Sequence, residues 1–404
     1  MPHQRVRYLN GILESSLRAS PIIGLMGQRQ TGKTTLAELF GGEYVTLDDE
    51  ESLELALRSA KTFIRGRSRP FVIDECQQSP SLFPALKEHV RTSRAMGQFL
   101  LTGSVRFTGV EEIKESLTGR MIELELLPFC LTEVHGLPLT DPVRFLQVKK
   151  LAEVMSSRQK SHKVSDPALR EFLAKGGLPG ICFLRSEILR TRKMRTHIKT
   201  ILDRDLRMVT RTTLDYLTLK TFLEEIAIQQ GEVFDLSRAA RGARIAMNSA
   251  RKLLAGLESV YLVRTILKQG DTHGRLVYLE DQGMASFLLR ERGQSFVEFR
   301  PVDLNRLLFQ QLNAQVKYND RHQVQLTSYR RRSGTMMDFV ISAAGVGRLG
   351  YSVGAGRQAT PHQIRSAQAF LKSAPGARAL LLHLGDGVRE LHPGLVEAPI
   401  WAAF

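Results

Sequence analysis

Nine consecutive residues near the start of the chain have the spacing of a phosphate-binding loop. They fit the pattern G-x-x-x-x-G-K-[ST] at every fixed position: Gly27, Gln28, Arg29, Gln30, Thr31, Gly32, Lys33, Thr34 and Thr35. The two glycines permit backbone angles and close approaches that a side chain would block. We expect the Lys33 ammonium at the β- and γ-phosphates of a nucleotide and the Thr34 hydroxyl on Mg²⁺. All nine residues are predicted to bind the cofactor, Mg-ATP.

The flanking residues predict the elements that such a loop needs. Pro21 to Met26 is a short apolar run typical of a buried strand, and Thr35 to Phe40 has helical spacing before two glycines. Strand, loop and helix in this order direct backbone N–H groups at an anion, and the helix dipole adds about half a positive charge. A chance glycine-rich turn is the alternative, and these flanking elements argue against it.

A second group of candidate residues ends an apolar run. Pro70 to Ile73 predicts a strand, and Asp74 and Glu75 follow it directly. Downstream of a phosphate-binding loop, this is the pattern of a carboxylate that holds Mg²⁺, largely through water, and a carboxylate that acts as a general base. We assign these roles to Asp74 and Glu75, respectively. For Glu75, a solvated loop carboxylate is the alternative.

A third strand, Gln98 to Gly103, ends in small polar residues. A hydroxyl at this place can contact the γ-phosphate or the attacking water, and Ser104 is the first choice with Thr102 second. The alternative is turn chemistry, in which Ser and Gly simply end a strand.

Taken together, these motifs resemble the AAA+-type ATPases of bacteria and archaea that carry a C-terminal domain of unknown function. The motifs occur in order at 27–35, 73–75, 101–104, 115–120 and 127–129. The resemblance covers most of the chain and is most specific up to about residue 135. It implies an α/β P-loop domain with a parallel sheet, and it makes Arg120 a candidate for γ-phosphate contact. An arginine finger can be worth about 10³–10⁵ in rate. A salt bridge from Arg120 to Glu115 or Glu123 is the alternative.

Charge points to an anionic partner. The chain has 57 Lys and Arg against 41 Asp and Glu, a formal charge of +16 with a pI near 10. Between Arg158 and Arg211 there are 14 Lys and Arg against 5 Asp and Glu. Nucleic acid is the simplest partner for such a stretch, and a generally basic, solvated surface is the alternative.

Three widely spaced cysteines, Cys76, Cys130 and Cys182, favour a reducing compartment over disulfides or structural zinc. The sequence shows neither a signal peptide nor an apolar run long enough to cross a bilayer. We therefore expect a cytoplasmic protein without a membrane partner.

The chain is divided into four predicted regions: a P-loop ATPase domain (1–135), a basic helical linker (136–215), a winged-helix-like domain (216–290) and a small α/β domain (291–404). The linker contains a long helix from Ser186 to Met208. In it, Asp203 and Asp205 match a signature of the resembled family. Since residues two apart do not face each other on a helix, we expect salt bridges to neighbouring arginines rather than a metal pair.

The third region has the pattern of a helix-turn-helix with a wing. Helices are predicted at 216–226, 234–240 and 246–257, and a wing hairpin is formed by strands at 260–263 and 276–279. Asn248, Arg251 and Lys252 lie on the polar face of the last helix, where they could meet duplex DNA. Such units also serve as protein–protein adaptors, so a protein partner stays open, as does a homo-oligomer.

In the resembled family, the last region is similar to a PD-(D/E)XK nuclease core. Here Asp338 is kept, but Met336 replaces a frequent Glu, and Ser352 and Gly354 stand where Glu and Lys belong. One acid cannot hold Mg²⁺ and activate water alone, so no nuclease activity is expected and Asp338 is interpreted as structural.

The sequence thus predicts an Mg²⁺-dependent ATPase whose nucleotide state controls a basic, DNA-binding C-terminal half. The alternative is a nucleotide-gated scaffold that binds protein partners with little turnover.

Overall fold

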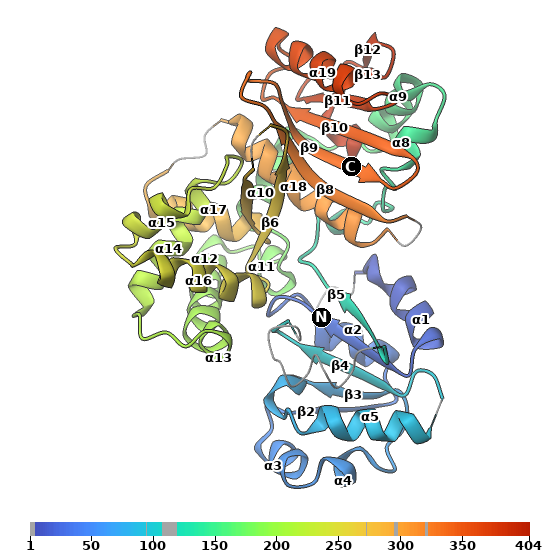
Figure 1. Cartoon of the computed structure of the whole chain (residues 1–404), viewed down its shortest axis with the longest axis vertical. Helices are drawn as coiled ribbons and strands as arrows, with labels where there is room; N and C mark the ends of the chain where they lie inside the picture. The colour runs from blue at the N-terminus through green and yellow to red at the C-terminus, as the bar shows by residue number, and fades with distance from the viewer. Residues whose placement is uncertain (1–4, 94, 107–118, 272, 295–297, 320–321) are drawn as a thin grey trace.

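The structure, a computed structural model, describes residues 5–93, 95–106, 119–271, 273–294, 298–319 and 322–404. Figure 1 shows the blue-to-cyan N-terminal part at the bottom, a green-to-yellow helical part on the left and an orange-to-red sheet at the top. Among these residues, no helix combines the length and the apolarity needed to cross a membrane.

The N-terminal part is built on a parallel sheet in the order β2-β3-β4-β1-β5. Its strands are β1 (Ile22–Met26), β2 (Glu43–Thr46), β3 (Phe71–Asp74), β4 (Phe99–Gly103) and β5 (Met121–Glu125). The three central strands are buried along their whole length, as their continuous apolar runs predict. Since all strands run in one direction, the residues that follow β1, β3 and β4 meet at one edge of the sheet.

Helices cover both faces of this sheet. One face packs against α1 (Leu9–Ala19) and α2 (Lys33–Phe40), and the other against α3 (Glu50–Arg58), α4 (Ala60–Ile64) and α5 (Leu82–Thr92). Alternation along β1 explains the two cores: Ile23 and Leu25 face the first set, and Ile22 and Met26 face the second. The predicted α/β domain with a parallel sheet is confirmed.

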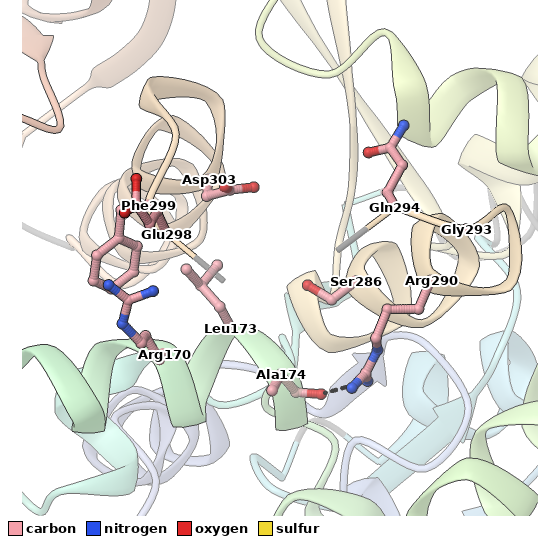
Figure 2. Close-up of a pocket in the computed structure, with 10 residues that line it drawn as sticks. All are labelled: Arg170, Leu173, Ala174, Ser286, Arg290, Gly293, Gln294, Glu298, Phe299 and Asp303. Carbon is pink, nitrogen blue, oxygen red and sulfur yellow. Dashed lines mark hydrogen bonds between the residues drawn. The ribbon is translucent and has the colours of Figure 1, made fainter. Parts of the chain in front are cut away.

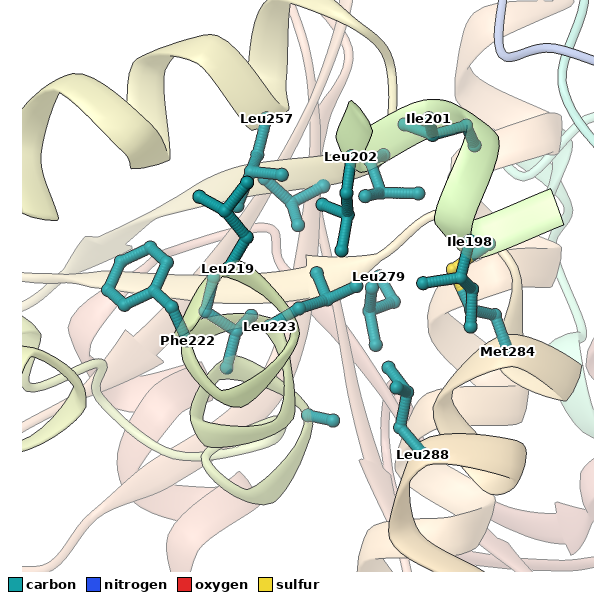
Figure 3. Packing of buried hydrophobic residues seen from close by; sticks show 14 of the residues in the cluster. Ile198, Ile201, Leu202, Leu219, Phe222, Leu223, Leu257, Leu279, Met284 and Leu288 are labelled. Atoms are coloured by element: carbon teal, nitrogen blue, oxygen red, sulfur yellow. The ribbon is translucent and has the colours of Figure 1, made fainter. Parts of the chain in front are cut away.

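Residues 178–289 contribute to a separate core, in which Leu219 and Leu223 lie near Leu202 and Leu257 (Figure 3). Its elements are α11 (Pro179–Cys182), α12 (Glu187–Thr200), the π-helical turn η3 (Ile201–Asp205), α13 (Leu206–Val209), α14 (Tyr216–Ile228), α15 (Leu236–Gly242), α16 (Met247–Ser259) and α17 (Gln282–Glu291). We call this part the helical unit. The long helix predicted at 186–208 is present, but η3 interrupts its α-helical geometry.

A mixed sheet in the order β12-β13-β11-β10-β9-β8-β6-β7 forms the third part. Its strands are β6 (Val263–Gln269), β7 (Arg275–Leu279), β8 (Val324–Arg330), β9 (Met336–Ala343), β10 (Gly347–Val353), β11 (Arg378–His383), β12 (Arg389–His392) and β13 (Leu395–Pro399). Helices α18 (Pro301–Lys317) and α19 (Pro361–Ser373) and the short η4 (Ile400–Ala403) pack on it. The predicted hairpin is present and pairs Val263 with Leu279, but its first strand is displaced: β6 begins at Val263, where the predicted strand 260–263 ends, because Val260 caps α16 and Tyr261 has a φ of 56°. Strand β6 also joins β8.

The polar stretch after β5 packs with the end of the chain. Its helices are α7 (Leu131–Val134), α8 (Arg144–Gln147), α9 (Leu151–Ser161) and α10 (Asp166–Lys175). Figure 1 shows α8 and α9 beside the upper sheet. Phe145 and Met155 share a core with Trp401 and Phe404, and the Arg158 Nε donates to the Ala402 carbonyl at 2.8 Å. The packing therefore joins the first half of the predicted 136–215 linker to the C-terminal sheet and the second half to the helical unit.

Candidate functional site

The loop between β1 and α2 has the backbone of a phosphate cradle. Gly27 and Gly32 have φ angles of 148° and 94°, and Gln30 has a φ of 63°. A Cβ on Gly27 would lie 2.3 Å from the Leu126 carbonyl oxygen, so only glycine fits there. Helix α2 begins at Lys33, which places its free N–H groups at the loop.

Lys33 is buried against its own loop. Its Nζ donates to the carbonyls of Gly27 and Gln28 at 2.8 and 2.9 Å. Burial lowers the pKa of this ammonium to about 8. A desolvated cation whose two hydrogen bonds go to neutral carbonyls is suited to an incoming phosphate.

Asp74 lies beside Thr34, as the spacing predicted. The Thr34 hydroxyl donates to Asp74 Oδ2 at 3.1 Å, and the Tyr44 hydroxyl donates to the same oxygen at 2.8 Å. The Thr102 hydroxyl donates to Oδ1. A hydroxyl and a carboxylate next to a phosphate cradle are the oxygen ligands that Mg²⁺ takes, so the donor set fits this ion. Tyr44 was not predicted, because nothing in the sequence links β2 to the end of β3.

Glu75 is held in a left-handed conformation, with a φ of 52°. Its Oε2 accepts hydrogen bonds from Gln77 Nε2 at 2.5 Å and from the Ser104 hydroxyl at 3.3 Å. The side chain is therefore part of a buried polar cluster and not a solvated loop carboxylate. Ser104, the first choice among the hydroxyls after β4, contacts this candidate base, whereas Thr102 contacts Asp74.

Three buried polar atoms around the loop have no hydrogen-bond partner in the described part of the chain. They are Gln28 Oε1, Gln77 Oε1 and His197 Nδ1. Buried groups of this kind are normally satisfied by protein, water or ligand. Gln28 belongs to the loop, and Gln77 and His197 contact Glu75 and Gln28, respectively, so the three side chains surround the candidate site.

Two side chains of the helical unit, His197 and Asp205, contact the P-loop. His197 of α12 lies 3.3 Å from Gln28, measured between Nε2 atoms. Burial, and then the charges of Arg29 and Lys33, lower the pKa of His197 to about 3, which keeps it neutral. Asp205 of η3 accepts from Arg29 Nε at 3.0 Å and from Nη2 at 3.3 Å.

The expectation that Asp203 and Asp205 pair with neighbouring cations is half right. Asp203 pairs with Lys199 and Arg207 on its own helix. For Asp205 the prediction is wrong, because its partner Arg29 is 176 residues away and belongs to the P-loop. Helical spacing reports only neighbours within a turn or two, so it could not find this contact.

Arg7 supports the loop from the other side and was also missed. It donates to the Thr31 carbonyl at 2.8 Å and the Leu127 carbonyl at 2.6 Å, and its Nε pairs with Glu133 at 2.8 Å. These contacts fix the back of the loop relative to the segment after β5.

Arg120 lies at the opposite end of the sheet from the P-loop of its own chain. It precedes β5, whose first residue pairs in register with Ile22 at the start of β1, and its carbonyl accepts from the Ser20 hydroxyl. Among the described residues Arg120 makes no ion pair. The alternative partner Glu115 lies outside the described residues. A γ-phosphate contact within the same chain does not agree with this position, and a contact across subunits stays a prediction.

A cavity of about 530 Å³ lies between α10, α17 and the start of α18 (Figure 2). Leu173 and Phe299 provide apolar lining, and Arg290 reaches across to the Ala174 carbonyl at 3.4 Å. None of the described P-loop residues lines it, so it is not the nucleotide site.

Comparison with known proteins agrees with the P-loop geometry. Residues 19–135 match the model of a family described as an AAA domain. This match and the geometry of the loop support a P-loop ATPase domain in the N-terminal part of the chain. Residues 166–294 match a domain of unknown function (DUF8612). This second match begins at the start of α10 and includes α11 to α17, the whole helical unit.

The curated relatives of the chain carry no assigned function. Uncharacterized proteins of Mycobacterium tuberculosis and Mycobacterium bovis are each 25% identical over 399 residues, which is 96% of this chain and 82% of theirs. A solved Walker-type ATPase of Pyrococcus abyssi is 16% identical, with a TM-score of 0.39 over 69% of this chain and 94% of that chain. This last likeness is too distant to support any conclusion about activity.

Proposed function

We propose that the chain binds Mg-ATP at the P-loop and hydrolyses it. The observation that carries this proposal is the convergence of Lys33 and Thr34, at the start of α2, with Asp74 and Glu75, at the end of β3, at one edge of the sheet. Lys33 would hold the β- and γ-phosphates, and Thr34 and Asp74 would hold Mg²⁺, which neutralises charge on the phosphates. Glu75 would accept a proton from the attacking water. Ser104 and Gln77 would hold the Glu75 carboxylate in place through their hydrogen bonds to Oε2.

Nucleotide binding and hydrolysis are tested separately. Mg-ATP at 100 times its Kd should raise the free energy of unfolding by about 2.7 kcal/mol, read from urea titrations with and without nucleotide. Glu75→Gln should keep this stabilisation and lose phosphate release. If wild-type unfolding is insensitive to Mg-ATP, nucleotide binding is wrong; if Glu75→Gln hydrolyses at the wild-type rate, the assignment of the base is wrong.

We further propose that the basic C-terminal half binds duplex DNA under control of the nucleotide. The supporting observation is the exposed face of α16, which presents Asn248, Arg251 and Lys252, next to exposed arginines of α15 and the turn that follows it. Arg238, Arg241 and Arg244 are the neighbouring exposed cations. Clustered cations on the second helix of a helix-turn-helix suit the phosphates and bases of a major groove.

No nuclease reaction is proposed. Asp338 is buried, and both of its oxygens are used: Oδ2 accepts from the Val353 N–H at 2.9 Å, and Oδ1 from the Asn305 amide at 3.1 Å. Burial raises the pKa of this carboxyl. A buried carboxyl that bonds α18 to β10 suits a structural role.

The second candidate function is a nucleotide-gated scaffold with little turnover. The contacts of Gln28 and Arg29 with the helical unit favour a nucleotide-dependent shape, which both functions need. Steady-state phosphate release decides between them: turnover that depends on Glu75 supports the ATPase, and tight ATP binding without turnover supports the scaffold.

A further inference from the structure

The Arg29 guanidinium lies between two carboxylates from different parts of the molecule. Two of its nitrogens bind Asp205 in a fork, and Nη2 lies 3.8 Å from Glu75 Oε1. The Arg29 and Asp205 side chains are only 17% and 2% exposed. A bidentate pair fixes the plane of a guanidinium as well as its charge, which a single contact would not do.

The two carboxylate oxygens of Glu75 have different partners. Oε2 accepts from Gln77 and Ser104, while Oε1 faces the Arg29 guanidinium at ion-pair distance. The carboxylate therefore has one anchored oxygen and one oxygen whose direction Arg29 sets. For a general base, that second oxygen is the one open to a water proton.

Two of the three partners of Glu75, Arg29 and Ser104, are connected to the core of the helical unit. Asp205 is in η3, whose neighbours Ile201, Leu202 and Leu206 are buried in that core. Val105, which directly follows Ser104, is buried in the same core.

Arg106 connects the segment that follows β4 to the end of α16. Its N–H donates to the Ser259 carbonyl at 2.8 Å, and its Nε donates to the Glu258 carbonyl at 3.0 Å. A shift of the helical unit relative to the P-loop would therefore change two of the three contacts of Glu75, those with Arg29 and Ser104.

We infer that Asp205 is a positioning residue for ATP hydrolysis, which holds Arg29 against Glu75 and so makes the orientation of the base depend on docking of the helical unit. This inference rests on the ATPase function proposed above. Asp205 touches no reacting atom, so its effect passes through Arg29. The competing explanation is a structural clamp, in which the Arg29–Asp205 pair only holds two parts of the chain together.

The test compares Asp205→Asn, Arg29→Lys and the double variant. Asparagine has the shape of aspartate without its charge, and lysine keeps the charge of arginine without its fork. We expect each single variant to lower kcat roughly 10- to 100-fold, the loss that misplacement of a catalytic group can cause. In Asp205→Asn the Kd for Mg-ATP should change less than about threefold, because the P-loop contact of Asp205 is with Arg29 alone among the described residues. All rates are measured below the melting temperature of each variant.

Two results distinguish positioning from clamping. If Asp205 acts through Arg29, the double variant loses no more activity than the worse single variant, because the same interaction is removed twice. A melting temperature that falls in Asp205→Asn while kcat stays within twofold of wild type would overturn the inference in favour of the clamp. Arg204→Ala is the matched control: it removes an exposed 2.7 Å ion pair with Asp48 across the same interface and should leave kcat unchanged.

The same assay separates failure of the inference from failure of the proposed function. If wild type hydrolyses Mg-ATP and Glu75→Gln does not, the ATPase stands, and a wild-type rate in Asp205→Asn refutes the positioning role alone. If wild type shows no turnover that depends on Glu75, the proposed function fails and the inference fails with it.

Discussion

At the scale of single residues, burial of the charged P-loop lysine disfavours folding unless an anion lies beside it. Lys33 is buried, and its two close partners are neutral carbonyls. Burial lowers its pKa to about 8 from 10.5, so its charge costs folding free energy at neutral pH. We attribute this cost to function, because the same desolvated ammonium strengthens contact with a phosphate.

Lys33→Met should separate stability from function. We expect the nucleotide-free variant to be more stable than wild type by about 1–2 kcal/mol, because an apolar side chain of similar length replaces a buried charge but loses two hydrogen bonds. The stabilisation by Mg-ATP should disappear in the same variant. Urea unfolding with and without Mg-ATP measures both, and Lys87→Met, on the exposed face of α5, is the control. A destabilised variant would contradict the desolvation argument.

The pH dependence of the free energy of unfolding should reflect the titration of Lys33. Its folded-state pKa lies below its unfolded value, so the unfolded state binds more protons between about pH 8 and 10.5. Stability of wild type relative to Lys33→Met should therefore rise as pH increases through this window and stay level below pH 8. The difference between the two unfolding free energies at pH 7, 9 and 10 measures it. A difference that does not change with pH would show that the ammonium is not desolvated.

At the scale of elements, α16 has two faces with different tasks. Leu253, Leu254 and Leu257 are buried in the helical core, whereas Arg251 and Lys252 are exposed. The buried face explains why the helix forms, and the exposed face is what we expect to meet DNA.

Arg251→Ala combined with Lys252→Ala should weaken binding to a duplex and reduce its salt dependence. Each lost phosphate contact removes about 0.9 from the slope of log K against log salt concentration. Fluorescence anisotropy of a labelled duplex between 50 and 200 mM salt measures the slope. Lys372→Ala, on the exposed side of α19, should leave it unchanged. If the variant keeps the wild-type slope, DNA binds at another surface of the protein. If wild type binds no duplex at low salt, a protein partner is favoured.

At the scale of the whole molecule, one largely buried arginine, 13% exposed, joins the P-loop domain to the large sheet. Arg264 of β6 pairs with Glu125 at the end of β5 and with Glu280 after β7. Lys317 of α18 adds a further 3.0 Å contact to Glu125. Burial opposes ionisation of Glu125, but the charge of Arg264 prevails and lowers its pKa to about 2. A buried network of this kind makes the relative position of the two parts specific.

Arg264→Met should destabilise the protein by about 3–5 kcal/mol, because two buried carboxylates lose their shared partner. The loss should be smaller at pH 5 than at pH 7, since burial already raises the pKa of Glu280 and that carboxyl becomes neutral first. Urea unfolding at the two pH values measures both effects. Arg195→Met, which removes an exposed pair with Glu291, should change stability little. An Arg264→Met effect as small as that of the control would show that the network does not hold the parts together.

The sequence by itself determined the phosphate cradle and the strands that build its sheet. Lys33, Thr34, Asp74 and Glu75 follow apolar runs whose carboxyl ends must meet in a parallel sheet, so local pattern and general topology were enough. The expected pairing with a neighbouring arginine is also present for Asp203, whose carboxylate lies 3.9 Å from Arg207.

Only the tertiary structure decided which distant residues surround that cradle. Asp205, His197 and Arg7 reach it from segments whose own periodicity says nothing about the P-loop, and the stretch after β5 packs with the end of the chain. Periodicity specifies which face of an element is buried, but not against what. That choice depends on how several cores fit together, and here it brings the helical unit to the candidate catalytic carboxylate.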